Sequence, residues 1–379
     1  MRFASALSED VDTTSALADA LGQVTDAIDG DPDLIVAFAT PHHHGAIEHI
    51  ASVTASIARD ASFGCIAEGV VAGDREIDSG RGLVVWAARV PGGVFDAAQV
   101  EAIRVPQGVT VTGGPAIADA AGVVVLADPF SFPAGAYGSR LASRGLPAVG
   151  GVPNAGRGPG GGALFANGDV FSHGAVAASF GGALEFRPSV SQGCRPLGEP
   201  VVVTDSADRV LSGLAGRPAF THLQDMFSRL SDEDRALARH GLHIGIVMDE
   251  YQAEYGTGDF LIRAVIGIDQ ASGTIEVGDK VPVGRTVQFQ VRDPGTADVD
   301  LREVLDGGAS SGGVLLFTCN GRGERFFGES DHDASLVAAA LRPPALAGMF
   351  AAGEIGPVGS GNYLHGFTAS LVEIRPTTA

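Results

Sequence analysis

The sequence predicts an α/β protein of two lobes, built from repeated strand–loop–helix–strand–hairpin units with mixed sheets. Short apolar runs bounded by glycine alternate with segments whose apolar residues recur every three or four positions, the patterns of buried strands and amphipathic helices. This order occurs three times along the chain. Two closing segments also match, because Phe171-Ser172-His173-Gly174 aligns with Tyr363-Leu364-His365-Gly366. A repeat of this length is a supersecondary module whose apolar face needs its neighbours.

The first copy follows an N-terminal helix. Residues 8–29 carry apolar side chains at helical spacing, and Gly30 follows as a stop signal. We then expect a buried strand, a loop, a second helix and two more strands, over residues 34–39, 40–45, 46–61, 63–70 and 82–86.

The second and third copies repeat this order. The second is predicted as a strand, a loop, a short helix, a strand and a hairpin, over residues 123–127, 130–138, 139–144, 148–152 and 163–180. The third is predicted as a strand, a loop, a helix and two strands, over residues 314–318, 320–323, 334–341, 349–355 and 363–374.

The segment from Gln192 to Arg217 interrupts the repeats with prolines, which predicts a crossing between a domain at 1–195 and a domain at 196–379. Beyond it, Ser231 precedes an acidic cluster, the pattern of a helix N-cap with acidic first-turn residues. The second domain is therefore expected to add two helices and three strands before the third copy, over residues 219–230, 231–239, 244–248, 260–268 and 286–292.

Composition excludes several classes of function. The 379 residues suffice for two domains, and a net charge of −20 repels nucleic-acid phosphates and anionic lipids. No apolar run is long enough to span a bilayer, and the N-terminus lacks a signal-peptide pattern. Three widely spaced cysteines do not form a disulfide framework and suit a reducing compartment. We expect a soluble cytoplasmic protein that neither binds nucleic acid nor inserts into membranes.

Polar residues directly follow the apolar strand of the third copy, where α/β folds place ligands. Cys319 and Asn320 are followed by Gly321, Arg322 and Gly323. The glycines allow close approach of the backbone, Asn320 offers a donor and an acceptor, and Arg322 can hold a carboxylate through two hydrogen bonds. The alternative interpretation is a tight turn in which Arg322 pairs with a neighbouring acid.

Glu354 lies in a stretch of otherwise small and apolar residues. A carboxylate there is costly to bury unless it is paired. It is predicted either to meet the amino group of a ligand or to form a structural salt bridge with Arg322, and both can hold at once.

His365 and His173 are predicted to open equivalent closing strands, either capping a backbone carbonyl or contacting a ligand. Ligand contact is favoured more for His365, because Asn362 and Tyr363 adjoin it. Cys65 follows Gly64 at a strand start, and no base is visible beside it in the sequence. We therefore interpret it as a small core residue in preference to a nucleophile.

These residues resemble the FIST domain family over nearly the whole chain. In the N-terminal half the resemblance lies in Gly64-Cys65 with Ala67-Glu68-Gly69, in Gly150-Gly151, and in Leu164-Phe165 with Gly168 and Val170. In the C-terminal half it lies in Phe317 with Cys319-Asn320-Gly321-Arg322-Gly323, in Ala352 to Pro357, and in Leu364-His365-Gly366 with Thr368-Ala369-Ser370.

The resemblance implies an intracellular sensory domain for a small ligand, with amino acids or their derivatives as proposed ligands. Such domains are often tied to chemoreceptors, histidine kinases or cyclic-dinucleotide enzymes. Since no output domain is expected here, the transducing role would come from a partner or be absent. We expect no metal, no catalytic residue and no bound cofactor. The expected ligand-binding residues are Cys319, Asn320, Gly321, Arg322, Glu354, Asn362, His365, Cys65 and Glu68.

Three alternatives remain open. The first is a haem-binding sensor of nitric oxide, which the family includes, with iron bound at His365 or in the loop of His42, His43 and His44. The second is an enzyme that acts on a small metabolite through Cys319 and His365, with Glu354 nearby. The third is a scaffold for protein–protein interaction, as an F-box relative suggests.

Overall fold

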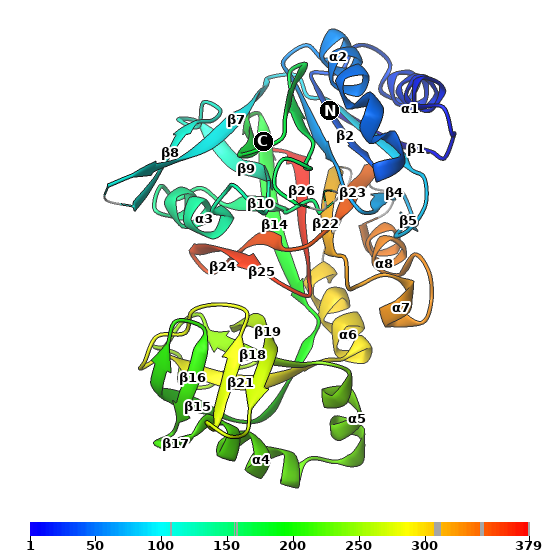
Figure 1. Ribbon diagram of the computed structural model, residues 1–379. Helices are drawn as coiled ribbons and strands as arrows, with labels where there is room; N and C mark the ends of the chain where they lie inside the picture. Colours follow the sequence, from blue (N-terminus) through cyan, green and yellow to red (C-terminus); the bar gives the residue numbers. More distant parts are fainter. Residues whose placement is uncertain (107, 155, 157, 307–311, 342–344, 378–379) are drawn as a thin grey trace. The chain divides into compact units, whose positions relative to one another are not determined.

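Three of the four sheets in the computed structural model share one strand order (Figure 1). The structure describes residues 1–377 except 107, 155, 157, 307–311 and 342–344. The chain forms two compact units. Unit 1 comprises Met1–Val190, Leu301–Leu364 and the residues from Thr368 onward, and unit 2 comprises Ser191–Asp300 with His365–Phe367. This division does not coincide with a boundary at residue 195, because the third copy pairs with the first two.

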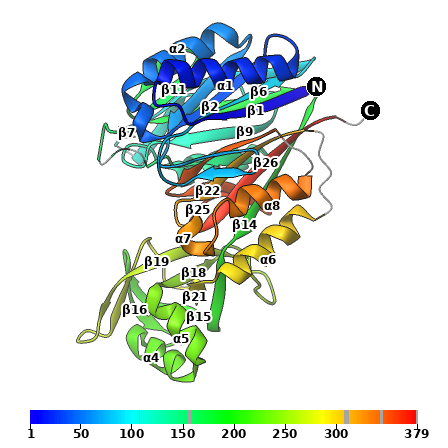
Figure 2. The ribbon, with the colours of Figure 1, turned by 90° about the vertical axis from the view of Figure 1, so that its right-hand side faces the viewer.

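The first sheet of unit 1 has the order β1-β6-β2-β3-β11-β12. Its strands β2 and β3 are parallel, and the other pairs are antiparallel. In sequence the strands are β1 (Arg2–Ser8), β2 (Leu34–Ala39), β3 (Ala61–Ile66), β6 (Leu83–Arg89), β11 (Leu164–Ala166) and β12 (Asp169–Phe171). Figure 2 shows α1 (Thr13–Ile28) and α2 (Ile47–Ile57) over the outer face of this sheet, where their apolar sides are buried.

The second sheet, β25-β24-β10-β9-β13-β7-β8, has the same core, with β9 and β10 parallel. Helix α3 (Ala134–Ala142) connects that pair. The strands are β7 (Gly93–Val105), β8 (Gly108–Gly113), β9 (Ala120–Ala127), β10 (Ala148–Gly151), β13 (Ala175–Gly182), β24 (Glu354–Val358) and β25 (Gly361–His365).

The third sheet has the order β14-β26-β22-β23-β4-β5, with β22 and β23 parallel. Helices α7 (Glu324–Phe327) and α8 (His332–Leu341) connect that pair. The strands are β4 (Val70–Ala72), β5 (Arg75–Ile77), β14 (Leu184–Gln192), β22 (Gly313–Cys319), β23 (Ala345–Ala351) and β26 (Thr368–Pro376). The predicted threefold repeat of strand, helix, strand and hairpin is thus confirmed.

Each copy gives its hairpin to the sheet of another copy. The hairpin β4–β5 of the first copy pairs with β23 of the third, and β11–β12 of the second pairs with β3 of the first. The hairpin β24–β25 of the third copy pairs with β10 of the second. The exchange is cyclic, so no sheet is complete without a neighbouring copy.

A glycine in the second parallel strand marks each copy. A Cβ atom at these positions would lie 1.8–1.9 Å from the carbonyl oxygen of the facing residue on the first parallel strand, the pairs being Gly64–Ala37, Gly150–Val125 and Gly348–Leu316. Only glycine fits there, because any side chain would overlap a backbone atom.

The inner faces of the three sheets form one core. Its members include Phe38 of the first sheet, Leu126 of the second and Phe317 of the third, all fully buried. The rings of Phe38 and Phe317 meet edge to face with centroids 6.1 Å apart. The near-continuous apolar strands of the sequence follow from this arrangement, because helices cover the outer faces and the sheets cover one another.

Unit 2 contains the fourth sheet, in which the antiparallel pairings run β15-β21-β18-β19-β20-β16 and return to β15. Its apolar core lies within this closed sheet and under α4 (Ala219–Arg229) and α5 (Asp232–His240). The strands are β15 (Cys194–Ala207), β16 (Val210–Leu214), β17 (Arg217–Pro218), β18 (Leu242–Val247), β19 (Phe260–Asp269), β20 (Thr274–Val277) and β21 (Thr286–Arg292).

The structure corrects several predicted boundaries. The segment 192–217 is not a crossing but supplies β15 and β16 to unit 2. The predicted closing strand at 363–374 is two strands, because Phe367 has a left-handed backbone (φ 65°) that interrupts the extended chain. The strand β1, the hairpin β7–β8 and helix α6 (Pro294–Leu305) were not predicted. The N-cap at Ser231 is confirmed, since its side chain accepts a hydrogen bond from the backbone of Asp234 at 3.0 Å.

Candidate functional site

Strands β22 and β23 end side by side at Cys319 and Ala351. Beyond them the chain turns tightly: the backbone N–H of Asn320 donates to Ala351 at 2.7 Å, and that of Arg322 donates to Cys319 at 2.7 Å. The polar residues of this turn therefore lie at the carboxyl ends of two parallel strands, where α/β sheets leave room for ligands.

The exchanged hairpin brings the first copy to this turn. The backbone N–H of Phe350 donates to the carbonyl of Gly69 at 3.0 Å, just before β4 pairs with β23. This pairing places Glu68 beside Asn320, whose Nδ2 donates to the Glu68 carboxylate at 2.8 Å. Of the predicted site residues, Glu68 and Asn320 are thus in direct contact although 252 positions separate them in sequence.

Arg322 pairs with Asp333, not with Glu354 as the structural interpretation predicted. Its Nε and Nη2 donate to the two carboxylate oxygens of Asp333 at 2.8 and 2.9 Å, and both side chains are buried. Thr318 also donates to Asp333, at 2.6 Å, and His332 lies 3.0 Å from it. The two-point contact that was predicted for a ligand carboxylate is therefore already used inside the protein.

Charge compensation explains why this ion pair is tolerated in the core. Burial raises the pKa of Asp333, but Arg322 and the donors from His332 and Thr318 outweigh burial and hold that pKa well below its usual range. The ring of Phe327 covers the guanidinium with 5.2 Å between Cζ and the ring centroid. The guanidinium of Arg322 is therefore held in place by Nε and Nη2, and only its Nη1 is not used in this ion pair.

Glu354 is fully buried at the start of β24, opposite Gly151 of β10. One carboxyl oxygen, Oε2, accepts hydrogen bonds from the backbone N–H and the hydroxyl of Thr368 at 3.1 and 2.8 Å. Burial raises the pKa of Glu354 to about 8, against the opposing effects of Thr368, Cys319 and Arg322. At neutral pH this carboxyl group is therefore mostly protonated.

Three buried polar atoms of this cluster have no hydrogen-bond partner among the described residues. They are Nη1 of Arg322, Oε1 of Glu354 and Oδ1 of Asn320. Arg322 interacts electrostatically with both Cys319 and Glu354, which places these groups in one neighbourhood. Native proteins rarely leave buried polar atoms unpaired, so these three atoms mark the cluster as a candidate ligand site.

Cys65 does not act as a nucleophile in this setting. It lies near the end of β3, not at a strand start, and its Sγ is 3.3 Å from the Sδ of Met349. Complete burial raises the pKa of its thiol, so the reactive thiolate is strongly disfavoured.

Asn362 is not brought to the cluster around Glu354. The side chain of Asn362 accepts from the backbone of Ala148 at 2.9 Å and donates to the carbonyls of Leu146 and Gly138 at 2.8 and 3.1 Å. These bonds use its amide fully at the beginning of β10, whereas Glu354 faces the end of that strand. His365 ends β25 and groups with unit 2.

The other predicted histidines form separate contacts. His42 contacts the carbonyl of Val11 at 3.0 Å. His43 is buried, and its Nδ1 lies 2.9 Å from the hydroxyl of Thr13. His173 is exposed and pairs with Glu101 at 3.3 Å. Within the described part of the chain, no three His, Cys, Asp or Glu side chains are arranged to hold a metal ion.

Two acidic residues of the cluster were missed in the sequence. Asp333 stands one position before the predicted helix at 334–341, and Glu76 lies on β5, where it accepts from the backbone N–H of Ala334 at 2.9 Å. Burial and the nearby Asp333 raise the pKa of Glu76 to about 8. The available signal was Asp333 itself, an acid directly before a predicted helix, because helix N-termini attract carboxylates; nothing in the sequence points to Glu76.

Comparison with known proteins covers most of the chain. Residues 33–217 match the FIST N domain and residues 219–357 match the FIST C domain. An uncharacterised protein of Mycobacterium bovis is 40% identical over 381 residues, covering 98% of this chain and 98% of that protein. An uncharacterised protein of Mycobacterium tuberculosis strain H37Rv is also 40% identical, with 98% and 99% covered. No described helix is long and apolar enough to cross a membrane. The domains FIST N and FIST C occur here in one continuous order, and the chain belongs to the FIST family.

Proposed function

We propose that this protein is an intracellular sensor that binds a small zwitterionic metabolite, an amino acid or a derivative, beside Glu354. FIST domains are associated with sensory and signal-transduction roles. The observation that carries the proposal is the set of unpaired buried atoms on Arg322, Glu354 and Asn320. Cys65, Cys194 and Cys319 are buried thiols that are not joined in disulfides, which supports a reducing compartment.

The acceptors match an ammonium group. Glu354 offers Oε1 and Asn320 offers Oδ1. Burial keeps Glu354 mostly protonated at neutral pH, since its pKa is about 8. A bound cation stabilises the ionised carboxylate, so binding of an ammonium group releases a proton from Glu354 at neutral pH.

The donor matches one oxygen of a carboxylate. Nη1 of Arg322 is unpaired, whereas its other edge is bound to Asp333. The ligand's carboxylate therefore forms one charge-assisted bond, not two. A rigid, pre-positioned donor loses little conformational freedom when the ligand arrives, which favours affinity.

Two contacts can pass the binding event onward. Asn320 is hydrogen-bonded to Glu68 of the first copy, two residues before β4. A movement of Asn320 would therefore displace the exchanged hairpin β4–β5. Glu354 is bonded to Thr368, the first residue of β26. Ionisation of Glu354 strengthens that bond, because an ionised acceptor binds donors more tightly.

The test is a thermal-shift screen of amino acids, each compared with its deaminated and decarboxylated analogues. We expect the zwitterion alone to raise the melting temperature. Calorimetry at pH 7 in two buffers of different ionisation enthalpy should show proton release on binding, and Glu354→Gln should abolish that release. Glu329→Gln, on an exposed loop, is the matched control.

Two results would contradict the proposal. One is a screen in which no amino acid stabilises the protein. The other is binding that proceeds with unchanged affinity and proton release in Glu354→Gln.

A further inference from the structure

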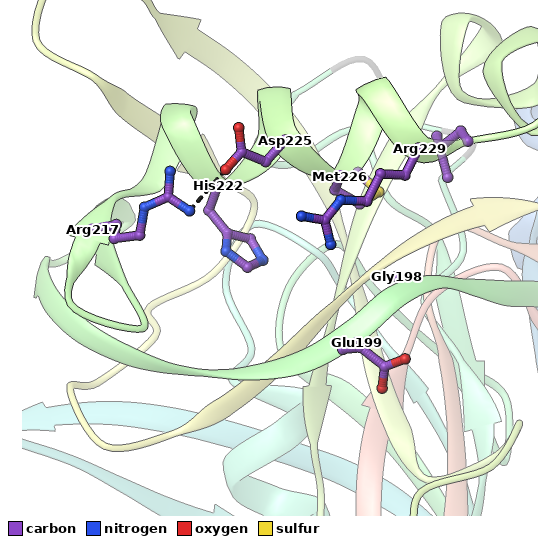
Figure 3. A pocket seen from close by; sticks show the side chains of 8 residues that line it. Gly198, Glu199, Arg217, His222, Asp225, Met226 and Arg229 are labelled. Carbon is purple, nitrogen blue, oxygen red and sulfur yellow. Dashed lines mark ion pairs between the residues drawn. The ribbon is translucent and has the colours of Figure 1, made fainter.

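Unit 2 contains a cavity of about 350 Å³ between helix α4 and strand β15 (Figure 3). This volume is at the lower end of the range for small-molecule sites. His222, Met226 and Arg229 occupy positions three to seven residues apart on α4, so they share one helix face and point into the cavity. The cavity lies wholly within unit 2 and shares no residue with the cluster at Glu354.

A bulge in β15 shapes the opposite wall. The pairing of β15 with β21 shifts register between Leu197 and Val201. Gly198 lies in this bulge with a φ of +65°, and a Cβ there would be 2.9 Å from Cγ of Met226. Glycine thus lets the backbone approach the helix closely, and Figure 3 shows the Glu199 side chain turned away from α4.

Two arginines and two carboxylates line the cavity, and one of the arginines, Arg229, has no carboxylate partner among the described residues. Arg217 pairs with Asp225 at 2.8 Å, so these two charges cancel. No carboxylate among the described residues pairs with Arg229, whose guanidinium extends toward the open space (Figure 3). Partial burial and the neighbouring Arg217 lower the pKa of His222, which keeps its ring neutral at pH 7.

The remaining lining suits an apolar body. Met226 and Leu230 contribute apolar side chains to the cavity. The ring of His222 lies nearly parallel to that of Phe289, with centroids 6.4 Å apart and planes inclined by 21°. A flat molecule can therefore lie against a fixed ring and an adaptable methionine.

We propose that this cavity is a second ligand site, which binds a small monocarboxylate with a flat apolar body. Arg229 pairs with the carboxylate, and Met226 and Leu230 contact the body. A single unpaired cation matches one negative charge, and Asp225 and Glu199 disfavour a second. A protein with a net charge of −20 repels anions in general, so an unpaired arginine at a cavity favours selective capture.

The experiment uses benzoate as the probe on the full chain, with methyl groups of methionine labelled by ¹³C. The chain has four methionines, and Met226 reports on this cavity while Met349 reports on the core beside Cys65. We expect benzoate to shift the Met226 signal and leave Met349 unchanged. Benzamide, the neutral analogue of the same shape, should bind at least about tenfold more weakly.

Variants test whether Arg229 binds the carboxylate of benzoate. Arg229→Gln should weaken benzoate binding about tenfold or more, and Arg229→Lys should restore part of it. Arg239→Gln, an exposed arginine in the last turn of α5, is the matched control and should not change binding. Circular dichroism of each variant should match the wild type, because Arg229 is exposed.

Several outcomes would overturn the assignment. They are a benzoate shift at Met349 instead of Met226, equal binding of benzamide, and full affinity in Arg229→Gln. Tighter binding of phenyl phosphate would show a site for dianions instead. Failure of the amino-acid screen at Glu354 leaves these outcomes unaffected, because the two sites share no residue and are followed by different measurements.

Discussion

Glu354 and Glu76 hold their protons at neutral pH because both are buried. Their folded pKa values of about 8 lie above the ordinary value of 4.5. A carboxyl group with a raised pKa contributes stability that is fully present below pH 4.5 and is lost as the pH rises through 8. Unit 1 should therefore become less stable between these limits.

Glu354→Gln should remove part of this dependence, because glutamine resembles the protonated acid and does not ionise. Relative to the wild type, its free energy of unfolding should rise by about 1 kcal/mol for each pH unit between pH 6 and pH 8. Urea titrations followed by fluorescence of Trp86, a buried residue of unit 1, measure this difference. Glu68→Gln changes an exposed carboxylate and should leave the slope as in the wild type; parallel slopes for all three proteins would refute the assignment.

Arg322→Ala should destabilise unit 1 by about 3–5 kcal/mol, because it leaves Asp333 buried without its cation. Arg325→Ala, three residues further on and exposed, should change stability by less than about 0.5 kcal/mol. The same urea titrations compare the two variants. A loss below about 1 kcal/mol for Arg322→Ala would mean that the Asp333 pair is not structural.

Sequence reasoning at this scale found the polar turn but not its partners. Arg322, Asn320 and Glu354 stand out because polar residues in apolar surroundings are conspicuous. Which acid Arg322 meets depends on burial and on helix packing, which residue types alone do not encode. Asn362 was expected in the site because it neighbours a histidine in sequence, yet its amide fastens β25 to the start of β10.

The element scale is dominated by the parallel strand pairs and their glycines. Gly348→Ala should destabilise unit 1 by about 3 kcal/mol or more, because its Cβ would lie 1.9 Å from the carbonyl oxygen of Leu316. Gly22→Ala in α1 is the control: nothing lies within 4 Å of its Cβ position, so alanine should stabilise the helix by about 1 kcal/mol. Melting temperatures should move in opposite directions, and equal shifts would contradict the steric explanation.

Strands and helices were predictable where one face alternates with a regular period. The strand at 34–39 and the helix at 219–230 agree with β2 and α4 to within one residue. Strand β8 is largely exposed and carries only two apolar residues, Val109 and Val111, so its pattern is weak. Gly366 directly precedes the break at Phe367, but the sequence analysis placed it inside one continuous closing strand.

At the scale of the whole molecule, unit 1 cannot be divided between copies. A fragment of residues 1–195 lacks β22, β23 and β26 of the third sheet and β24 and β25 of the second. We expect it to remain unfolded by NMR, whereas residues 191–300, with a closed sheet and a core of their own, should fold alone. A well-dispersed spectrum from the 1–195 fragment would show that the exchanged hairpins are dispensable.

The three copies were visible in the sequence, but the exchange between them was not. Repetition is local and can be seen in one chain, whereas the partner of an edge strand is chosen among all exposed strands. β4 could pair within its own copy by pattern alone, because its three residues, Val70 to Ala72, are equally apolar in either sheet.

During synthesis the hairpin β4–β5 is complete long before β23, the strand with which it pairs. Its strand β23 leaves the ribosome about 270 residues later, a delay of tens of seconds at roughly 5–20 residues per second. Throughout that interval Val70 and Val71, which are fully buried at the end, face water or a chaperone. The rate of translation therefore determines how long β4 remains an unpaired, aggregation-prone edge strand in each new chain. Slow translation of the second copy prolongs this exposure.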